Sequence, residues 1–268
     1  MPDSFTWEIM GLGFVAAILV GFVASYFGVF IVQRRMAFLG SGLAHAAFGG
    51  VALGILLDTQ PLFVALPFTI SVAIAIIWVR DHTGLAEDTV IGVMFSVAMA
   101  LGVVFLFLKE GFSGDAYTYL FGSVLAVSMT DVVLAGCMVA ATLCTFPLWG
   151  AWAYATFDRD LARTDRLRVV WHDYVLACAM SIVIVVSMKI VGMVLIAAFL
   201  VLPAATARML SQSFRQMTLI SIAIGVTTPA IGMYLSLFPD LPPGAPIILV
   251  QSAMFVAALV VRKQGMIK

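Results

Sequence analysis

Long apolar runs separated by short polar segments make up most of the chain. A helix needs about 17–25 mainly apolar residues to cross the ~30 Å hydrocarbon core of a bilayer. Because runs of about that length recur throughout, the pattern predicts an all-α, polytopic integral membrane protein with about nine transmembrane helices. The predicted spans are residues 11–32, 37–57, 62–79, 89–108, 132–155, 174–188, 190–207, 217–238 and 246–261.

The number of spans depends on one short connection. Only the turn-like segment Ser187–Lys189 separates the sixth predicted span from the seventh. Eight spans with one re-entrant segment, around Tyr117–Thr130, are the alternative.

The distribution of basic residues favours nine spans. With the N-terminus outside, twelve of the fourteen lysines and arginines fall in inner segments, and only Lys109 and Lys189 fall outside. Such an excess of cations on the cytoplasmic side is typical of membrane proteins. Merging residues 174–207 into one span would move the last five cations outside and abolish the asymmetry. We therefore expect the N-terminus outside and the C-terminus in the cytoplasm.

Composition narrows the classes of function. Apolar residues form 63% of the chain and charged residues 10%, against about 45–50% and about 25% in soluble domains. The formal net charge is zero, so nothing indicates a nucleic-acid partner. No lysine follows a glycine, so the phosphate-binding loop of nucleotide hydrolases is absent, and any ATP is expected on another chain. We expect one transmembrane domain over residues 1–268, with its longest inner segment at 156–173.

The second predicted span carries the strongest candidate for metal chemistry. His45 lies ten residues after Arg35, which is about 15 Å along a helix and near the centre of the hydrocarbon core. An ionisable side chain at that depth usually faces a cavity or a partner, and imidazole is a good ligand for zinc. Ser41, four residues earlier on the same face, is a weaker candidate ligand. A neutral histidine hydrogen-bonded to a neighbouring helix explains the position equally well.

A stripe of small residues runs along the same span. Gly42, Ala46, Gly50 and Gly54 recur at every fourth position. Small residues at this spacing allow two helix backbones to approach closely, so we expect tight packing along this face.

The cysteines and the other two histidines are weaker candidates. Cys137, Cys144 and Cys178 lie inside apolar runs without a histidine at ligand spacing, so packing explains them. His82 and His172 fall at the inner ends of predicted spans, where solvated interface positions are expected.

Two carboxylates begin the fourth predicted span. Glu87 and Asp88 fall in its first turn or just before it, where negative charge favours the positive end of the helix dipole. Stabilisation of the helix start is the simpler interpretation. A role in cytoplasmic ion exit or in docking of a partner is the alternative.

The inner segment after the fifth predicted span mixes charged and apolar residues, which indicates a short amphipathic helix parallel to the membrane. Such a helix lies on lipid headgroups or docks into a soluble partner, and the pattern does not separate the two. The residues expected at its contact surface are Phe157, Asp158, Asp160, Leu161 and Arg163.

Two rival classes of function are weakly supported. A secondary transporter driven by an ion gradient usually needs several intramembrane carboxylates, and Asp131, near an outer boundary, is the one candidate. A membrane-embedded serine protease needs a serine and a histidine on separate spans, and no predicted span except the second contains a histidine.

Four blocks of the chain resemble, in the same order, the permease family of zinc, manganese and iron ABC importers (ABC-3 type). The second span includes RRMAFLGSGLAHAAFGGVALG, the fourth begins EDTVIGVMFS, the sixth and seventh include VVSMKIVGMVLIAAFLVLPAATAR, and the last outer loop reads DLPPGAPIILV. The resemblance covers nearly the whole chain.

The resemblance implies a permease in a bacterial plasma (inner) membrane that is not itself an enzyme. Two permease copies would pair with two ATPase subunits on the cytoplasmic face, and an extracytoplasmic metal-binding protein would deliver the ion. The cargo would be zinc, with manganese or chelated iron as alternatives; no cofactor would be tightly bound, and ATP would act through the partner. His45 matches the histidine of the family, and Thr156–Arg168 matches its coupling region.

The chain departs from the family pattern in two places. Many members have an aspartate at the position of Ser41, so metal contact here would be weaker or would depend on another helix. The coupling region usually contains a proline near Arg159 and a glycine near Arg166. Their absence predicts an altered turn geometry.

Overall fold

The computed structural model describes residues 4–109, 119, 122, 127–236 and 244–265, and every regular element among them is helical. The helices are α1 (Ser4–Gln33), α2 (Ala37–Leu56), α3 (Pro61–Thr83), α4 (Glu87–Leu108), α6 (Met129–Cys144), the 3-10 helix η2 (Phe146–Leu148), α7 (Trp149–Phe157), α8 (Arg159–Thr164), α9 (Val169–Val191), α10 (Met193–Leu210), α11 (Phe214–Ser236) and α12 (Gly244–Gly265).

Most of these helices are long and apolar enough to cross a membrane. Seven meet that condition alone, and α6 with α7 forms an eighth, bent span. Helix α10 is shorter, with an apolar part at Leu195–Leu210, and counting it gives nine. The predicted all-α, polytopic architecture is therefore confirmed. The alternative re-entrant segment, Tyr117–Thr130, falls mostly outside the described residues.

The fifth predicted span is not one straight helix. Helix α6 ends at Cys144, and the chain resumes through η2 into α7 with a bend of 40°. Pro147 lies in η2, and proline removes a backbone donor and clashes with the preceding helical turn. The bend therefore follows from a residue visible in the sequence.

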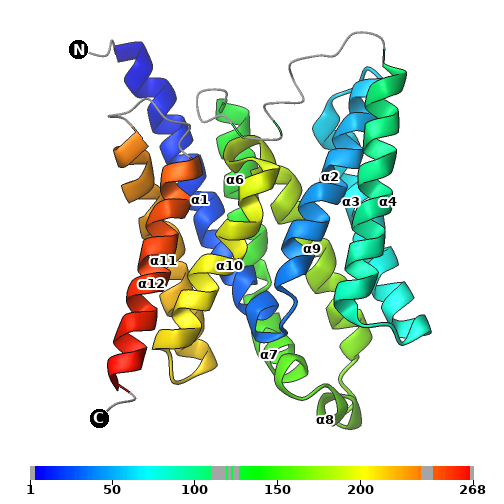
Figure 1. Cartoon of the computed structure of the whole chain (residues 1–268), viewed down its shortest axis with the longest axis vertical. Coiled ribbons are helices and arrows are strands. Elements are labelled where there is room, and N and C mark those ends of the chain that lie inside the picture. Colours follow the sequence, from blue (N-terminus) through cyan, green and yellow to red (C-terminus); the bar gives the residue numbers. More distant parts are fainter. Residues whose placement is uncertain (1–3, 110–118, 120–121, 123–126, 237–243, 266–268) are drawn as a thin grey trace.

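The turn between the sixth and seventh spans was predicted at Ser187–Lys189, and that position is wrong. Helix α9 continues to Val191, and the break falls at Gly192, which has φ 91° and ψ 143°. A residue with a side chain rarely adopts this conformation, whereas glycine does so readily. The glycine ends α9, and α10 then returns toward the end of the bundle that carries α8 (Figure 1).

The two ends of the bundle are distinct. Helix α1 begins at one end of the long axis, and α12 finishes at the opposite end, where α8 also lies (Figure 1). This arrangement agrees with an odd number of crossings. We refer below to the end that carries α8 as the α8 end.

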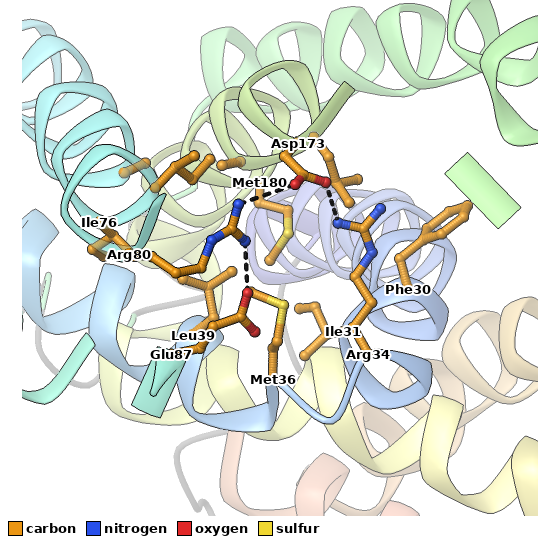
Figure 2. A pocket seen from close by; sticks show the side chains of 14 residues that line it. Phe30, Ile31, Arg34, Met36, Leu39, Ile76, Arg80, Glu87, Asp173 and Met180 are labelled. Atoms are coloured by element: carbon orange, nitrogen blue, oxygen red, sulfur yellow. Dashed lines mark hydrogen bonds and ion pairs between the residues drawn. The ribbon is translucent and has the colours of Figure 1, made fainter. Parts of the chain in front are cut away.

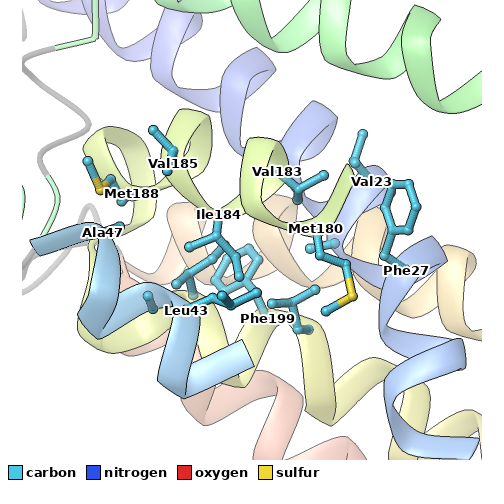
Figure 3. Packing of buried hydrophobic residues seen from close by; sticks show 14 of the residues in the cluster. Val23, Phe27, Leu43, Ala47, Met180, Val183, Ile184, Val185, Met188 and Phe199 are labelled. Atoms are coloured by element: carbon cyan, nitrogen blue, oxygen red, sulfur yellow. The ribbon is translucent and has the colours of Figure 1, made fainter. Parts of the chain in front are cut away.

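A continuous apolar core joins the central helices. Residues of α9 occupy its middle and pack against α1, α2 and α10 (Figure 3). The buried side chains at this meeting point include Val23, Phe27, Leu43, Ala47, Met180, Ile184, Met188 and Phe199. Helix α2 therefore packs against this core through Leu43 and Ala47.

The small-residue stripe of α2 is a packing surface, as predicted. A Cβ atom at Gly50 would lie 2.6 Å from the Cα of Ala65 in α3, and one at Gly42 would lie 2.5 Å from the side chain of Ile91 in α4. Both distances are shorter than real contacts allow, so α2 lies closely between α3 and α4. This packing fixes the direction in which the α2 side chains point.

Candidate functional site

His45 has one ring nitrogen engaged and one left for a ligand. Its Nδ1 lies 2.7 Å from the backbone carbonyl oxygen of Ser41, one helical turn earlier. A carbonyl only accepts hydrogen bonds, so Nδ1 carries the proton and donates it. Nε2 then keeps its lone pair. Metal-binding histidines are commonly held in this way, because a bond to the second nitrogen fixes the ring and its tautomer.

The ring of His45 faces α4. It meets Phe95 edge-on, with ring centroids 5.0 Å apart, and the residue is half-buried. The hydroxyl oxygen of Ser41 is 3.4 Å from Nδ1, the nitrogen that is already engaged. The backbone carbonyl of Ser41 therefore orients the ring of His45 through Nδ1. Whether either residue contacts an ion stays a prediction.

A complete metal site is not found within the described part of the chain. No three His, Cys, Asp or Glu side chains gather there as an ion-binding group. His45 thus presents a single imidazole, which would hold an ion weakly unless another chain or another conformation supplied further ligands.

A buried ionic cluster at the α8 end is the site that sequence reasoning missed. The side chain of Asp173, near the start of α9, is 3% exposed and pairs with three arginines from separate parts of the chain. The distances are 2.7 Å to Arg34 in the turn after α1, 3.1 Å to Arg80 of α3 and 2.9 Å to Arg159 of α8. Figure 2 shows Arg34 and Arg80 converging on Asp173. In the sequence, Asp173 is marked only as an acidic residue beside His172 near the start of a predicted span.

Further contacts extend this Asp173 cluster. Asp81 pairs with Arg80 at 2.9 Å and with Arg159 at 3.5 Å. Arg34 also donates through Nε to the hydroxyl of Thr156 in α7, at 2.9 Å. Arg80 donates to Glu87 at the start of α4, at 2.6 Å. The cluster therefore joins the ends of α1, α3, α4, α7, α8 and α9.

The Asp173 cluster is closed in this conformation. The cavity between its side chains has a volume of about 20 Å³, which is room for about one water molecule. A hydrated ion does not fit there. Glu87 is engaged by Arg80, whereas Asp88 is exposed, so an exit role for either carboxylate remains a prediction.

Arg159 links the predicted coupling segment to this cluster. Partial burial lowers the pKa of its guanidinium group, and the carboxylate of Asp173 opposes that shift. Arginine keeps its charge in proteins despite such shifts. The ion pair with Asp173 therefore attaches α8 to α9.

Helix α8 has an inward and an outward face. Ala162 is fully buried, whereas the side chains of Asp160 and Arg163 are 95% and 51% exposed. Leu161 is half exposed, and Asp158 caps the helix by accepting a hydrogen bond from the backbone N–H of Leu161. An exposed leucine between charged residues is typical of a contact surface.

Phe157, the remaining residue of the predicted contact surface, is partly used inside the chain. Its ring packs edge-on against Phe214 of α11 at 5.3 Å, yet 59% of the residue is exposed. The turn after α8 contains Arg166 with φ 63°. This is the left-handed region that glycine adopts at least cost, so the arginine bears the strain of a turn suited to glycine.

His82 and the outer charged residues have local partners, whereas the buried Nδ1 of His172 has no hydrogen-bond partner among the described residues. His82 is exposed and stacks on Trp78, while His172 is half-buried. Asp131 pairs with Lys189 at 2.7 Å and accepts hydrogen bonds from Ser128 at the start of α6. A carboxylate bound in this way is a poor candidate for the coupling ion of a secondary transporter. Lys109, just after α4, likewise pairs with Asp58, just after α2.

These features define a class of protein: a polytopic α-helical membrane protein with a short amphipathic helix, α8, at one end. A family model described as "ABC 3 transport family" matches residues 6–262. The chain belongs to that family, as its sequence blocks predicted.

Individual relatives extend over nearly the whole chain. The high-affinity zinc uptake system membrane protein ZnuB of Haemophilus influenzae is 31% identical, over 96% of this chain and 99% of the relative. The manganese transport system membrane protein MntC of Halalkalibacterium halodurans is 34% identical, over 94% of this chain and 87% of the relative. A solved structure of PsaBC from Streptococcus pneumoniae matches with a TM-score of 0.83 and 30% identity, over 93% of this chain and 90% of the other.

Proposed function

We propose that the chain is the membrane-spanning permease subunit of an ATP-driven importer of divalent metal ions. The observation that carries the proposal is the near full-length likeness to membrane proteins of zinc and manganese uptake systems. The free Nε2 of His45 gives the permease a ligand atom on a helix that is packed rigidly between its neighbours.

Zinc is the first candidate for the cargo. Imidazole nitrogen suits zinc, whereas manganese prefers carboxylate and carbonyl oxygen. Ser41 stands where many family members have an aspartate, so the α2 face offers an imidazole without that carboxylate. Manganese and chelated iron remain the alternatives. Weak binding by one imidazole suits a pathway, because an ion held tightly midway would not leave.

ATP hydrolysis is assigned to a separate subunit. Two copies of the chain are expected to assemble with two ATPase subunits at the α8 end. An extracytoplasmic binding protein would deliver the ion at the opposite end of the bundle. The outward face of α8 is the proposed docking surface. Because Arg159 joins α8 to the Asp173 cluster, a shift of α8 would be transmitted to the bundle. The chain would thus lie in a bacterial plasma membrane with its C-terminus in the cytoplasm.

Combined charge reversal at Asp160 and Arg163 is expected to weaken binding of the ATPase without abolishing it. Both side chains are exposed and 3.9 Å apart, and pairs at such a rim contribute about 0.2–1 kcal/mol each. The measurement is co-purification of the ATPase with the D160R/R163D permease, together with stimulated ATP hydrolysis. Arg262→Asp, a charge reversal at an exposed position of α12, which ends across the bundle from α8 (Figure 1), is the control. Unchanged association would remove α8 from the docking surface.

The topology is tested by cysteine labelling in intact cells. Met129 is 62% exposed at the start of α6, and Gln212 is exposed between α10 and α11, at the α8 end. In a background with the native cysteines replaced by alanine, a membrane-impermeant maleimide should label Met129→Cys and spare Gln212→Cys until the cells are opened. The reverse pattern would invert the proposed orientation.

A further inference from the structure

A membrane-facing groove lies between α3 and α6, with α9 as its floor. It holds about 590 Å³ of open space, and its walls are almost entirely apolar. Ile74 of α3, Ala141 of α6 and Cys178 of α9 represent its three sides. Neither the ion-path candidate His45 nor the Asp173 cluster borders this space.

The groove continues toward the opposite end of the bundle. A second cavity, of about 560 Å³, shares Met138, Ala141 and Ile182 with the first and reaches the ion pair of Lys189 and Asp131. The floor runs from Trp171 to Lys189 along α9, which is eighteen residue steps or about 27 Å at 1.5 Å per step. This length is close to the ~30 Å thickness of the hydrocarbon core.

The α8 end of the groove has the chemistry of a membrane interface. Trp171, which is 64% exposed, and Tyr174 line it there, and both residue types favour the headgroup level of a bilayer. Arg166 and Arg168 lie five and three residues before Trp171, and both are exposed. Neither has an ion-pair partner among the described residues. Cations at that level attract anionic lipid headgroups.

The floor of the groove does not favour a transmembrane helix as its occupant. Helix pairs in membranes approach closely through small residues spaced four apart, as α2 does with its own neighbours. The floor has small residues only in its middle, at Cys178 and Ala179, and bulky ones on both sides, including Trp171, Val175, Ile182 and Val186. A flexible acyl chain fits between such side chains without close backbone contact.

We infer that the α3–α6–α9 groove binds an anionic phospholipid from the leaflet at the α8 end. Its acyl chain lies along α9 between α3 and α6, and its phosphate is held near Arg166 and Arg168. This inference goes beyond the transport function. It holds whichever metal the chain carries.

Native mass spectrometry of the purified permease–ATPase complex, released from nanodiscs of equal phosphatidylglycerol and phosphatidylethanolamine, tests the site. Ala141 is exposed and lines both cavities, whereas Ala140 is exposed on the same helix and lines neither. The parent and Ala140→Trp should retain phosphatidylglycerol, and Ala141→Trp should lose most of it. Equal retention in the two tryptophan variants would overturn the inference.

A second pair of substitutions tests the headgroup contact without filling the groove. Arg166→Asn places at that position a residue that tolerates positive φ, and Arg168→Gln keeps a polar side chain and removes the charge. Each should reduce the preference for phosphatidylglycerol over phosphatidylethanolamine by roughly fivefold, because a cation near an anionic surface contributes about 1 kcal/mol. An unchanged preference, or the loss of a bound polypeptide instead of a lipid in Ala141→Trp, would contradict a lipid site.

Discussion

His45→Ala is expected to lower metal uptake sharply while leaving the permease assembled with its ATPase. The substitution removes Nε2, the free ligand atom, from a half-buried position on α2. Loss of even an outer-shell partner of a metal site commonly costs about 10–100-fold in affinity or activity, so loss of the ligand itself should cost at least that much. The measurement is uptake of radioactive zinc and manganese by cells at low metal concentration.

Two further variants separate ligation from packing. His45→Asn retains a donor near the Nδ1 position for the Ser41 carbonyl but lacks Nε2, so it should transport as poorly as His45→Ala. Ser41→Ala keeps that carbonyl and removes only the hydroxyl, so its effect should be small. Uptake at the parental rate by His45→Asn would show that the histidine is structural.

Asp173→Asn is expected to destabilise the protein more than any other single charge removal at the α8 end. Arg34 then has no carboxylate partner among the described residues, whereas Arg80 keeps Asp81 and Glu87 and Arg159 keeps Asp81. Breaking a buried ion pair by removing one partner costs about 3–5 kcal/mol, because the remaining charge is left uncompensated. Thermal unfolding of the purified permease in one detergent, followed by tryptophan fluorescence, measures the loss.

The matched control is Asp160→Asn, which removes the same charge from a side chain that is 95% exposed and should leave the unfolding temperature unchanged. Adding Arg159→Gln to Asp173→Asn lowers the excess positive charge and should restore part of the stability. If Asp173→Asn unfolds like the parent, the cluster does not hold the helix ends together.

The sequence predicted those features that depend on spacing along a single helix. Apolar runs of membrane length located most helices, and the stripe at Gly42 and Gly50 predicted close packing. The turn before α10 was misplaced because polar Ser187 and Lys189 lie within the last turns of α9. Gly192 ends that helix through its backbone conformation.

The sequence by itself determined the membrane class, the helical architecture and the place of His45 near the middle of one helix, because these depend on composition and on residue order within one span. The tertiary structure decided which carboxylate gathers Arg34, Arg80 and Arg159. These arginines lie 139, 93 and 14 positions before Asp173, and only helix packing brings all of them to it. It also decided the tautomer of His45 and the groove along α9. Partner choice among charged side chains is set by the positions of helix ends, and no local pattern specifies those positions.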